Sequence, residues 1–165
     1  PQAAAARPPE VSAPAPVEAP ADKPLGVVIP MDDIVPQARV LLAEDNPINQ
    51  KVTSLTLRRL GYRPEVVSDG AQAVDSVRTG AYDVVLMDIM MPVMDGLQAT
   101  AAIHHDCGPH PRPAIVALTA NAMEGDRQNC LDAGCDDYLA KPVAPEDLAA
   151  TIERAIRERS EGAVA

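Results

Sequence analysis

Five short apolar segments, each followed by polar or turn-forming residues, mark the chain from residue 39 onward. They span residues 39–43, 64–68, 84–87, 114–118 and 137–140, and the second is the weakest. Each segment is too short for a helix, and such aliphatic runs are typical of strands buried on both faces of a parallel sheet. The pattern therefore predicts five strands.

A helix is predicted after every strand. After the first, Asn46 is an N-cap residue, Pro47 suits the first helical position, and Ile48, Val52 and Leu55 recur at helical spacing. Capping-box spacings begin three more helices, at Asp69 with Gln72, Asp95 with Gln98, and Asn121 with Glu124. The last helix opens at Pro145 and has an inward stripe of Leu148, Ile152 and Ile156.

Alternating strands and helices predict an α/β fold, with a five-stranded parallel sheet, right-handed crossovers and five helices on both faces. Residues 1–36 hold nine of the seventeen prolines, which favours a disordered Pro/Ala-rich linker. We expect the folded domain at 37–159 and a disordered C-terminal tail at 160–165. Because the chain does not begin with Met, we expect it to be a piece of a longer protein.

Charge and cysteine usage limit the possible partners. The net charge is -10 without a basic stripe, which argues against nucleic acid. The three cysteines include no C-x-x-C pair, and this favours free thiols in the cytoplasm. No apolar run reaches the roughly 20 residues of a membrane span, so we expect no direct membrane contact, although the longer protein could be membrane-anchored.

Four of the five strands end in chemically capable residues, namely Glu44 with Asp45, Asp88, Thr119 and Lys141. The carboxyl ends of parallel strands meet at one edge, where three acids would repel one another unless they hold a proton or a hard cation. Mg²⁺ suits carboxylate ligands best. Lys141 and Thr119 would then surround an anion on Asp88, which predicts a nucleophile that becomes an aspartyl phosphate.

Four motifs in this order resemble the receiver domain of two-component response regulators over residues 39 to about 158. They are Glu-Asp-Asn-Pro at 44–47, Leu-Met-Asp-Ile-Met-Met-Pro-Val-Met-Asp-Gly at 86–96, Ala-Leu-Thr-Ala at 117–120 and Asp-Tyr-Leu-Ala-Lys-Pro at 137–142. The residues at 46–50, 120–123 and 136–138 are most similar to the corresponding sequences of receivers at the end of hybrid sensor histidine kinases.

The resemblance implies a (βα)5 flavodoxin-like fold with strand order 2-1-3-4-5 and Asp88 as phosphoacceptor. It also implies roles for further residues. These are Mg²⁺ held by Asp45, Asp88, the Met90 carbonyl and, through water, Glu44; Thr119 and Tyr138 as a switch pair; and a cis peptide between Lys141 and Pro142.

The resemblance further implies a bacterial two-component phosphorelay. The phosphoryl donor would be the histidine kinase core of the parent chain or a histidine phosphotransfer protein. The fragment would catalyse only its own phosphorylation and dephosphorylation, so it is not an enzyme by itself. Its parent would be a hybrid protein-histidine kinase.

Two alternatives and one unexplained loop stay open. A receiver-like module could regulate its parent kinase without phosphorylation, but such modules usually lack an acid or the lysine. A magnesium-dependent phosphatase with an aspartyl nucleophile would need a second acid where this chain has Met90. One loop contains His104, His105, Cys107 and His110. Binding of a soft metal by these residues is the less favoured interpretation.

Overall fold

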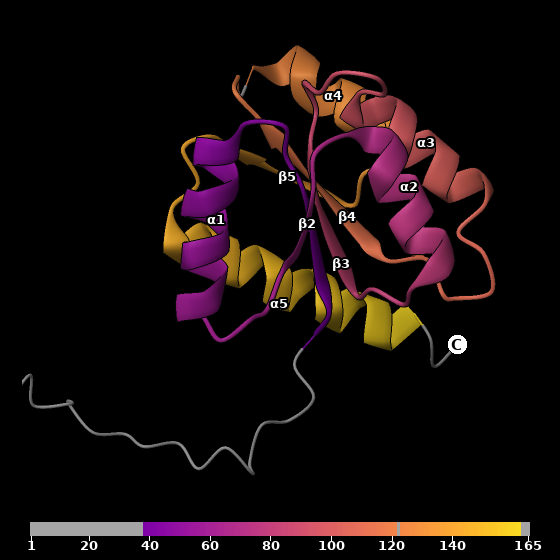
Figure 1. Ribbon diagram of the computed structural model, residues 1–165, viewed down its shortest axis with the longest axis horizontal. Helices are drawn as coiled ribbons and strands as arrows, with labels where there is room; N and C mark the ends of the chain where they lie inside the picture. Colours follow the sequence, from indigo (N-terminus) through magenta and orange to yellow (C-terminus); the bar gives the residue numbers. More distant parts are fainter. Residues whose placement is uncertain (1–37, 122, 163–165) are drawn as a thin grey trace, which may run out of the picture. The chain divides into compact units, whose positions relative to one another are not determined.

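The strands follow the apolar runs of the sequence in the computed structural model, which describes residues 38–121 and 123–162 (Figure 1). The strands are β1 (Val40–Ala43), β2 (Glu65–Val67), β3 (Val84–Asp88), β4 (Ala114–Thr119) and β5 (Asp137–Ala140). The helices are α1 (Pro47–Arg59), α2 (Gly70–Thr79), α3 (Gly96–His105), α4 (Glu124–Ala133) and α5 (Pro145–Gly162). The expected linker at 1–36 lies outside the described residues.

All strand pairs are parallel, and their order across the sheet is β2-β1-β3-β4-β5. The register aligns Leu42 with Leu86 and Leu86 with Val116, so the central strands end near one another. The predicted α/β fold and its strand order are therefore confirmed.

Side chains of the central strands alternate between two helical layers. Val85 and Ile115 belong to a core shared with α2 and α3, whereas Leu86 and Val116 pack in a second core with Leu57 of α1 and with α5. Figure 1 shows α1 and α5 on one side of the sheet and α2 and α3 on the other. Cover on both faces explains why these strands are continuously apolar.

Three helix starts follow the predicted capping. At the start of α1, the Asn46 side chain accepts hydrogen bonds from the Ile48 and Asn49 N–H groups. The Asp69 side chain accepts a hydrogen bond from the Gln72 N–H at 2.8 Å. Asp95 accepts one from the Gln98 N–H at 2.8 Å, and the Gln98 side chain accepts one from the Asp95 N–H at 3.2 Å, which completes a capping box.

The start of α4 differs from the prediction. The helix begins at Glu124, and the preceding Met123 makes no side-chain cap. Asn121 is therefore not its N-cap. The main chain of Asn121 instead exchanges two hydrogen bonds with the Thr119 hydroxyl, which fixes the strand-to-helix loop to β4.

The apolar stripe of α1 faces away from the core. Ile48, Val52 and Leu55 are 72%, 59% and 46% exposed, while Leu57 is the buried residue of the helix. Helical periodicity predicted the helix correctly, but this stripe does not hold it against the sheet. Three exposed aliphatic side chains on one helix are available to a partner.

Residues 160–162 belong to α5, so the helix continues beyond the domain boundary expected at 159. Arg159 anchors this turn by donating hydrogen bonds to Asp83 Oδ1 at 2.7 Å and to the Tyr82 carbonyl at 3.2 Å. Ser160 also donates to the Ile156 carbonyl at 3.0 Å. Within 38–121 and 123–162, neither α5 nor another helix has the length and apolar character needed to cross a membrane.

Gly96 allows α3 to start against the end of β3. A Cβ atom at this position would lie 2.2 Å from the Asp88 carbonyl oxygen and 2.9 Å from Ile89 Cα. We predict that Gly96→Ala lowers the free energy of unfolding by about 2 kcal/mol, because main-chain atoms would have to move. Gly125→Ala is the control: its Cβ meets nothing within 4 Å, so it should be neutral or slightly stabilising. Urea unfolding followed by circular dichroism would contradict this if both variants matched the wild type.

Candidate functional site

Four strands deliver polar side chains to the same edge of the sheet. Glu44 and Asp45 follow β1, Asp88 ends β3, Thr119 ends β4 and Lys141 follows β5. The strands are parallel, so their carboxyl ends lie at one edge, where α/β proteins commonly bind ligands. The structure gathers the three acids within 4.8 Å of one another and places Lys141 in contact with two of them, Glu44 and Asp88, while Thr119 is turned toward its own loop.

The three acids form a compact oxygen cluster. Glu44, Asp45 and Asp88 each offer a carboxylate oxygen, and these atoms lie within 4.8 Å of one another. Glu44 and Asp88 are 1% and 5% exposed, whereas Asp45 is open to solvent. The Met90 N–H donates to Asp88 Oδ1 at 3.1 Å, so the main chain after β3 borders the cluster. This donor set fits a hard divalent cation such as Mg²⁺.

Lys141 bridges the two buried acids. Its Nζ lies 2.7 Å from Glu44 Oε2 and 2.9 Å from Asp88 Oδ2. The Lys141 N–H donates to the Thr119 carbonyl at 2.7 Å, and the Lys141–Pro142 peptide bond is cis. One ammonium group thus contributes positive charge to two carboxylates that are hidden from water.

Burial and charge act in opposite directions on these groups. For Glu44, burial raises the pKa, but Lys141 and the Asn46 N–H outweigh it, so the pKa lies below its usual value. For Asp88, burial and the nearby Glu44 charge together keep the pKa above its usual value in spite of Lys141. Burial would lower the pKa of Lys141, yet its two carboxylate partners raise it. Lys141 is therefore held as a cation.

The Thr119 hydroxyl points into its own loop. Thr119 Oγ1 donates to the Asn121 carbonyl at 2.7 Å and accepts from the Asn121 N–H at 3.1 Å. Tyr138, on β5, is half-buried, and the Arg127 guanidinium lies 5.5 Å from the centre of its ring. Both side chains have partners in this conformation that they would have to leave in order to move.

Two residues of α1 also contact the site, and the sequence analysis gave them no role. The Asn49 amide donates to Glu44 Oε1 at 3.4 Å. The Gln50 amide donates to the Glu44 carbonyl at 2.5 Å and to Ser68 Oγ at 3.3 Å. Their spacing in the Asn-Pro-x-Asn-Gln motif, just after the acids, was the only signal available.

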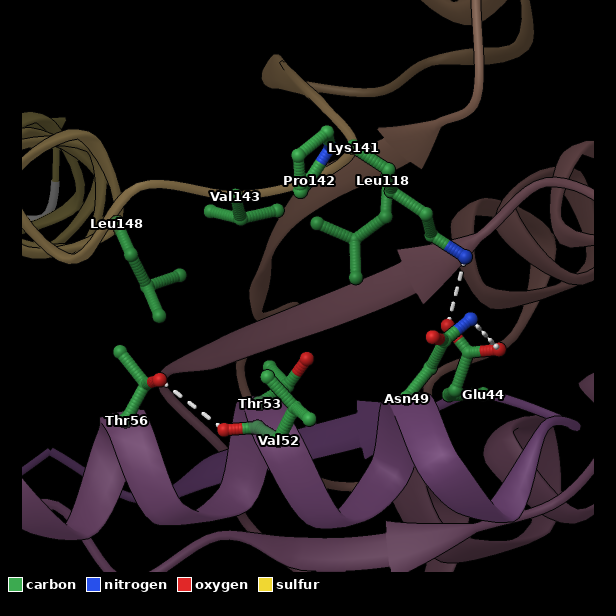
Figure 2. A pocket seen from close by; sticks show the side chains of 10 residues that line it. All are labelled: Glu44, Asn49, Val52, Thr53, Thr56, Leu118, Lys141, Pro142, Val143 and Leu148. Atoms are coloured by element: carbon green, nitrogen blue, oxygen red, sulfur yellow. Dashed lines mark hydrogen bonds and ion pairs between the residues drawn. The ribbon is translucent and has the colours of Figure 1, made fainter.

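A pocket of about 120 Å³ opens beside the acids, between α1 and the segment that joins β5 to α5 (Figure 2). Its lining residues are Glu44, Asn49, Val52, Thr53, Thr56, Leu118, Lys141, Pro142, Val143 and Leu148. Figure 2 shows the Lys141 and Asn49 nitrogens converging on the Glu44 carboxylate at one end of this pocket. The pocket thus extends from the polar site to Val52, one residue of the exposed stripe of α1.

The cluster of His104, His105, Cys107 and His110 does not assemble into a metal site. Within the described ranges, the acidic group is the only set of three or more His, Cys, Asp or Glu residues close enough to share an ion. The Cys107 thiol donates to the His110 carbonyl at 3.3 Å, and His104 Nε2 lies 2.6 Å from the Gly134 carbonyl oxygen. The side chains of His104 and Cys107 thus contact main-chain oxygen atoms.

Comparison with known proteins identifies related sequences. The family model for the response regulator receiver domain matches residues 40–153. Hybrid signal transduction histidine kinase B of Dictyostelium discoideum is 42% identical over 120 residues, which cover 67% of this chain and 6% of that protein. The sensor protein GacS of Pseudomonas syringae pv. syringae is 41% identical over 116 residues, covering 69% and 13%. The chain spans a small part of these relatives.

Two solved structures are also similar. The receiver domain of the sensor histidine kinase PA1611 from Pseudomonas aeruginosa PAO1, which has a magnesium ion in its active site cleft, matches with a TM-score of 0.66 and 48% identity. This match covers 72% of the chain and 97% of that domain. A structure of the Saccharomyces cerevisiae Ssk1 receiver domain with the histidine phosphotransfer protein Ypd1 matches with a TM-score of 0.68 and 30% identity, covering 75% and 92%.

Proposed function

Because the chain belongs to the response regulator receiver domain family, we propose that it accepts a phosphoryl group from phosphohistidine onto Asp88. The observation that best supports this is the contact of Lys141 with Asp88 beside two further acids. Asp88 ends the central strand β3 at the carboxyl edge of the sheet, where it is 5% exposed. A buried carboxylate beside a fixed cation is suited to receive a phosphoryl group.

In the proposed transfer, an Asp88 oxygen attacks phosphorus, and the bond between phosphorus and the histidine nitrogen breaks. Lys141 neutralises negative charge on the phosphoryl oxygens, from its position 2.9 Å from Asp88. Water later attacks the phosphorus of the aspartyl phosphate, the bond between phosphorus and the Asp88 oxygen breaks, and inorganic phosphate leaves, which restores the carboxylate. The domain therefore catalyses its own phosphorylation and dephosphorylation, without acting on a separate substrate.

Mg²⁺ is the cofactor that we infer for this reaction. Asp45, Asp88 and the Met90 carbonyl would hold it directly, and Glu44 through water; when bound, it supplies further positive charge to the phosphoryl oxygens. The cluster of three carboxylate oxygens supports this inference. Magnesium in the cleft of the related PA1611 receiver supports it as well.

Thr119 and Tyr138 form the proposed switch. A phosphoryl group on Asp88 offers new acceptor oxygens, for which the Thr119 hydroxyl would leave Asn121. The loop before α4 would follow, and the Tyr138 ring would move inward, away from Arg127. Phosphorylation would thus shift the population between two arrangements of the surface formed by α4, β5 and α5.

The proposed partner is a histidine phosphotransfer protein or the kinase core of a parent hybrid histidine kinase. The exposed stripe of Ile48, Val52 and Leu55 lies on the helix that follows the acids and borders the pocket. A related receiver, that of Ssk1, forms a complex with Ypd1, and related sequences occur within hybrid histidine kinases. Regulation without phosphorylation is the alternative, but the complete set of acids and Lys141 favours the phosphoacceptor.

The first test concerns the nucleophile. Phosphoramidate with Mg²⁺ should add one phosphoryl group to the domain, because the proposed catalytic residues all belong to this chain. Intact mass should show this addition for the wild type and for Asp75→Asn, a change in an exposed acid of α2, but not for Asp88→Asn. Stable labelling of Asp88→Asn would disprove the assignment.

A second test addresses the switch. With beryllofluoride as the phosphoryl mimic, Thr119→Ala should lose most of the amide shift changes around Tyr138, because no hydroxyl can reach the new oxygens. Thr119→Ser keeps the hydroxyl and should retain them. If all three proteins respond equally around Tyr138, the switch does not depend on Thr119.

The third test concerns docking. Leu55→Glu and Leu131→Glu place the same charge at comparably exposed leucines, on α1 and α4 respectively. The measured quantity is the ratio of two rates, phosphotransfer from phosphorylated Ypd1 and labelling by phosphoramidate. We expect Leu55→Glu to lower this ratio about tenfold, the effect of one important interface side chain. Leu131→Glu should leave this ratio unchanged. Equal ratios for the two variants would place the docking surface elsewhere.

A further inference from the structure

Lys141 has two carboxylate partners, and the proposed function draws it toward one of them. Its Nζ now lies 2.7 Å from Glu44 Oε2 and 2.9 Å from Asp88 Oδ2. A phosphoryl group on Asp88 would attract the ammonium to its own oxygens and weaken the contact with Glu44. Glu44 is 1% exposed, so its carboxylate then needs other hydrogen-bond donors.

Those donors are present on the other side of the Glu44 carboxylate. Oε1 accepts the Asn46 N–H at 3.2 Å and the Asn49 amide at 3.4 Å, while Lys141 contacts Oε2. Figure 2 shows Asn49 reaching the carboxylate from α1 and Lys141 reaching it from the opposite side of the pocket. When Lys141 moves, the contacts on Oε1 can remain.

The main chain of Glu44 is fixed in the same way from two elements. The Gln50 amide, on α1, donates to the Glu44 carbonyl at 2.5 Å and to Ser68 Oγ at 3.3 Å. The Glu44 N–H donates to the carbonyl of Val67, on β2, at 3.1 Å. Gln50 therefore ties the acidic turn after β1 to the end of β2.

We propose that Asn49 and Gln50 are positioning residues that keep Glu44 in place for the metal when Lys141 turns to the phosphoryl group. The inference rests on the proposed function, and it assigns a role to the last two residues of the motif at 46–50. Asn49 stabilises the charge of the carboxylate, and Gln50 fixes its main chain. Neither residue touches the phosphoryl group, since both act through Glu44.

Titration with Mg²⁺ alone, followed by amide shifts, tests the proposal without a phosphoryl donor. Asn49→Ala and Gln50→Met should each raise the dissociation constant about threefold to tenfold, the effect of one hydrogen bond to a charged or fixed group. Asp45→Ala, which removes a direct ligand, should raise it more. Asn129→Ala is the matched control, because Asn129 is an exposed helical residue on α4 that shares no contact with the site.

A second measurement separates positioning from a general loss of stability. The Mg²⁺ concentration that half-saturates labelling by phosphoramidate should rise by the same factor in both variants, while their urea unfolding matches that of Asn129→Ala. If Asn49→Ala or Gln50→Met binds Mg²⁺ with the same affinity as Asn129→Ala, the residue changed in that variant does not position Glu44. If the wild type is not labelled at Asp88, the proposed function fails separately, and the metal titration still decides on Asn49 and Gln50.

Discussion

The contact of Lys141 with Glu44 and Asp88 is the interaction on which the site depends. Two carboxylates that are almost inaccessible to water need a cation or a full set of donors, since an unpaired buried charge is costly. Lys141 meets that need from the end of β5, across β4 and β3, so the charge balance of the site depends on the pairing of four strands, β1, β3, β4 and β5. In the proposed transfer, the same ammonium would reach the phosphoryl group from its position 2.9 Å from Asp88.

The sheet and the loops that follow its strands contribute differently to the site. The central strands are buried on both faces and parallel in register, which holds Asp88 close to the end of β1. The loops that follow the strands add main-chain contacts at the site: Asn121 bonds to the Thr119 hydroxyl, and the Met90 N–H bonds to Asp88. Gly96 lets α3 begin directly against the Asp88 main chain, so the loop after β3 stays short and close to the site.

Helix α1 serves the site in two ways. Its first turn directs Asn49 and Gln50 toward Glu44, and its outer face exposes Ile48, Val52 and Leu55. The pocket lies between α1 and the segment that joins β5 to α5, and its lining includes both Val52 and Lys141. A partner bound to the stripe would therefore lie next to the acids, which is the arrangement that direct phosphoryl transfer between two proteins requires.

The sequence by itself determined the α/β fold, because apolar runs and capping residues such as Asp69 and Asp95 act locally. It also indicated the acids, Thr119 and Lys141, since each directly follows or ends a strand. Tertiary structure decided the rest. Periodicity could not show that the stripe of α1 faces solvent or that Asn121 bonds to Thr119 while the start of α4 has no side-chain cap. Nor could it show that Arg159 bonds to Asp83 and that α5 continues to Gly162. Each of these outcomes depends on contacts between residues that are distant in the sequence, or on which of two possible hydrogen-bond partners a residue takes. The local sequence pattern predicts neither.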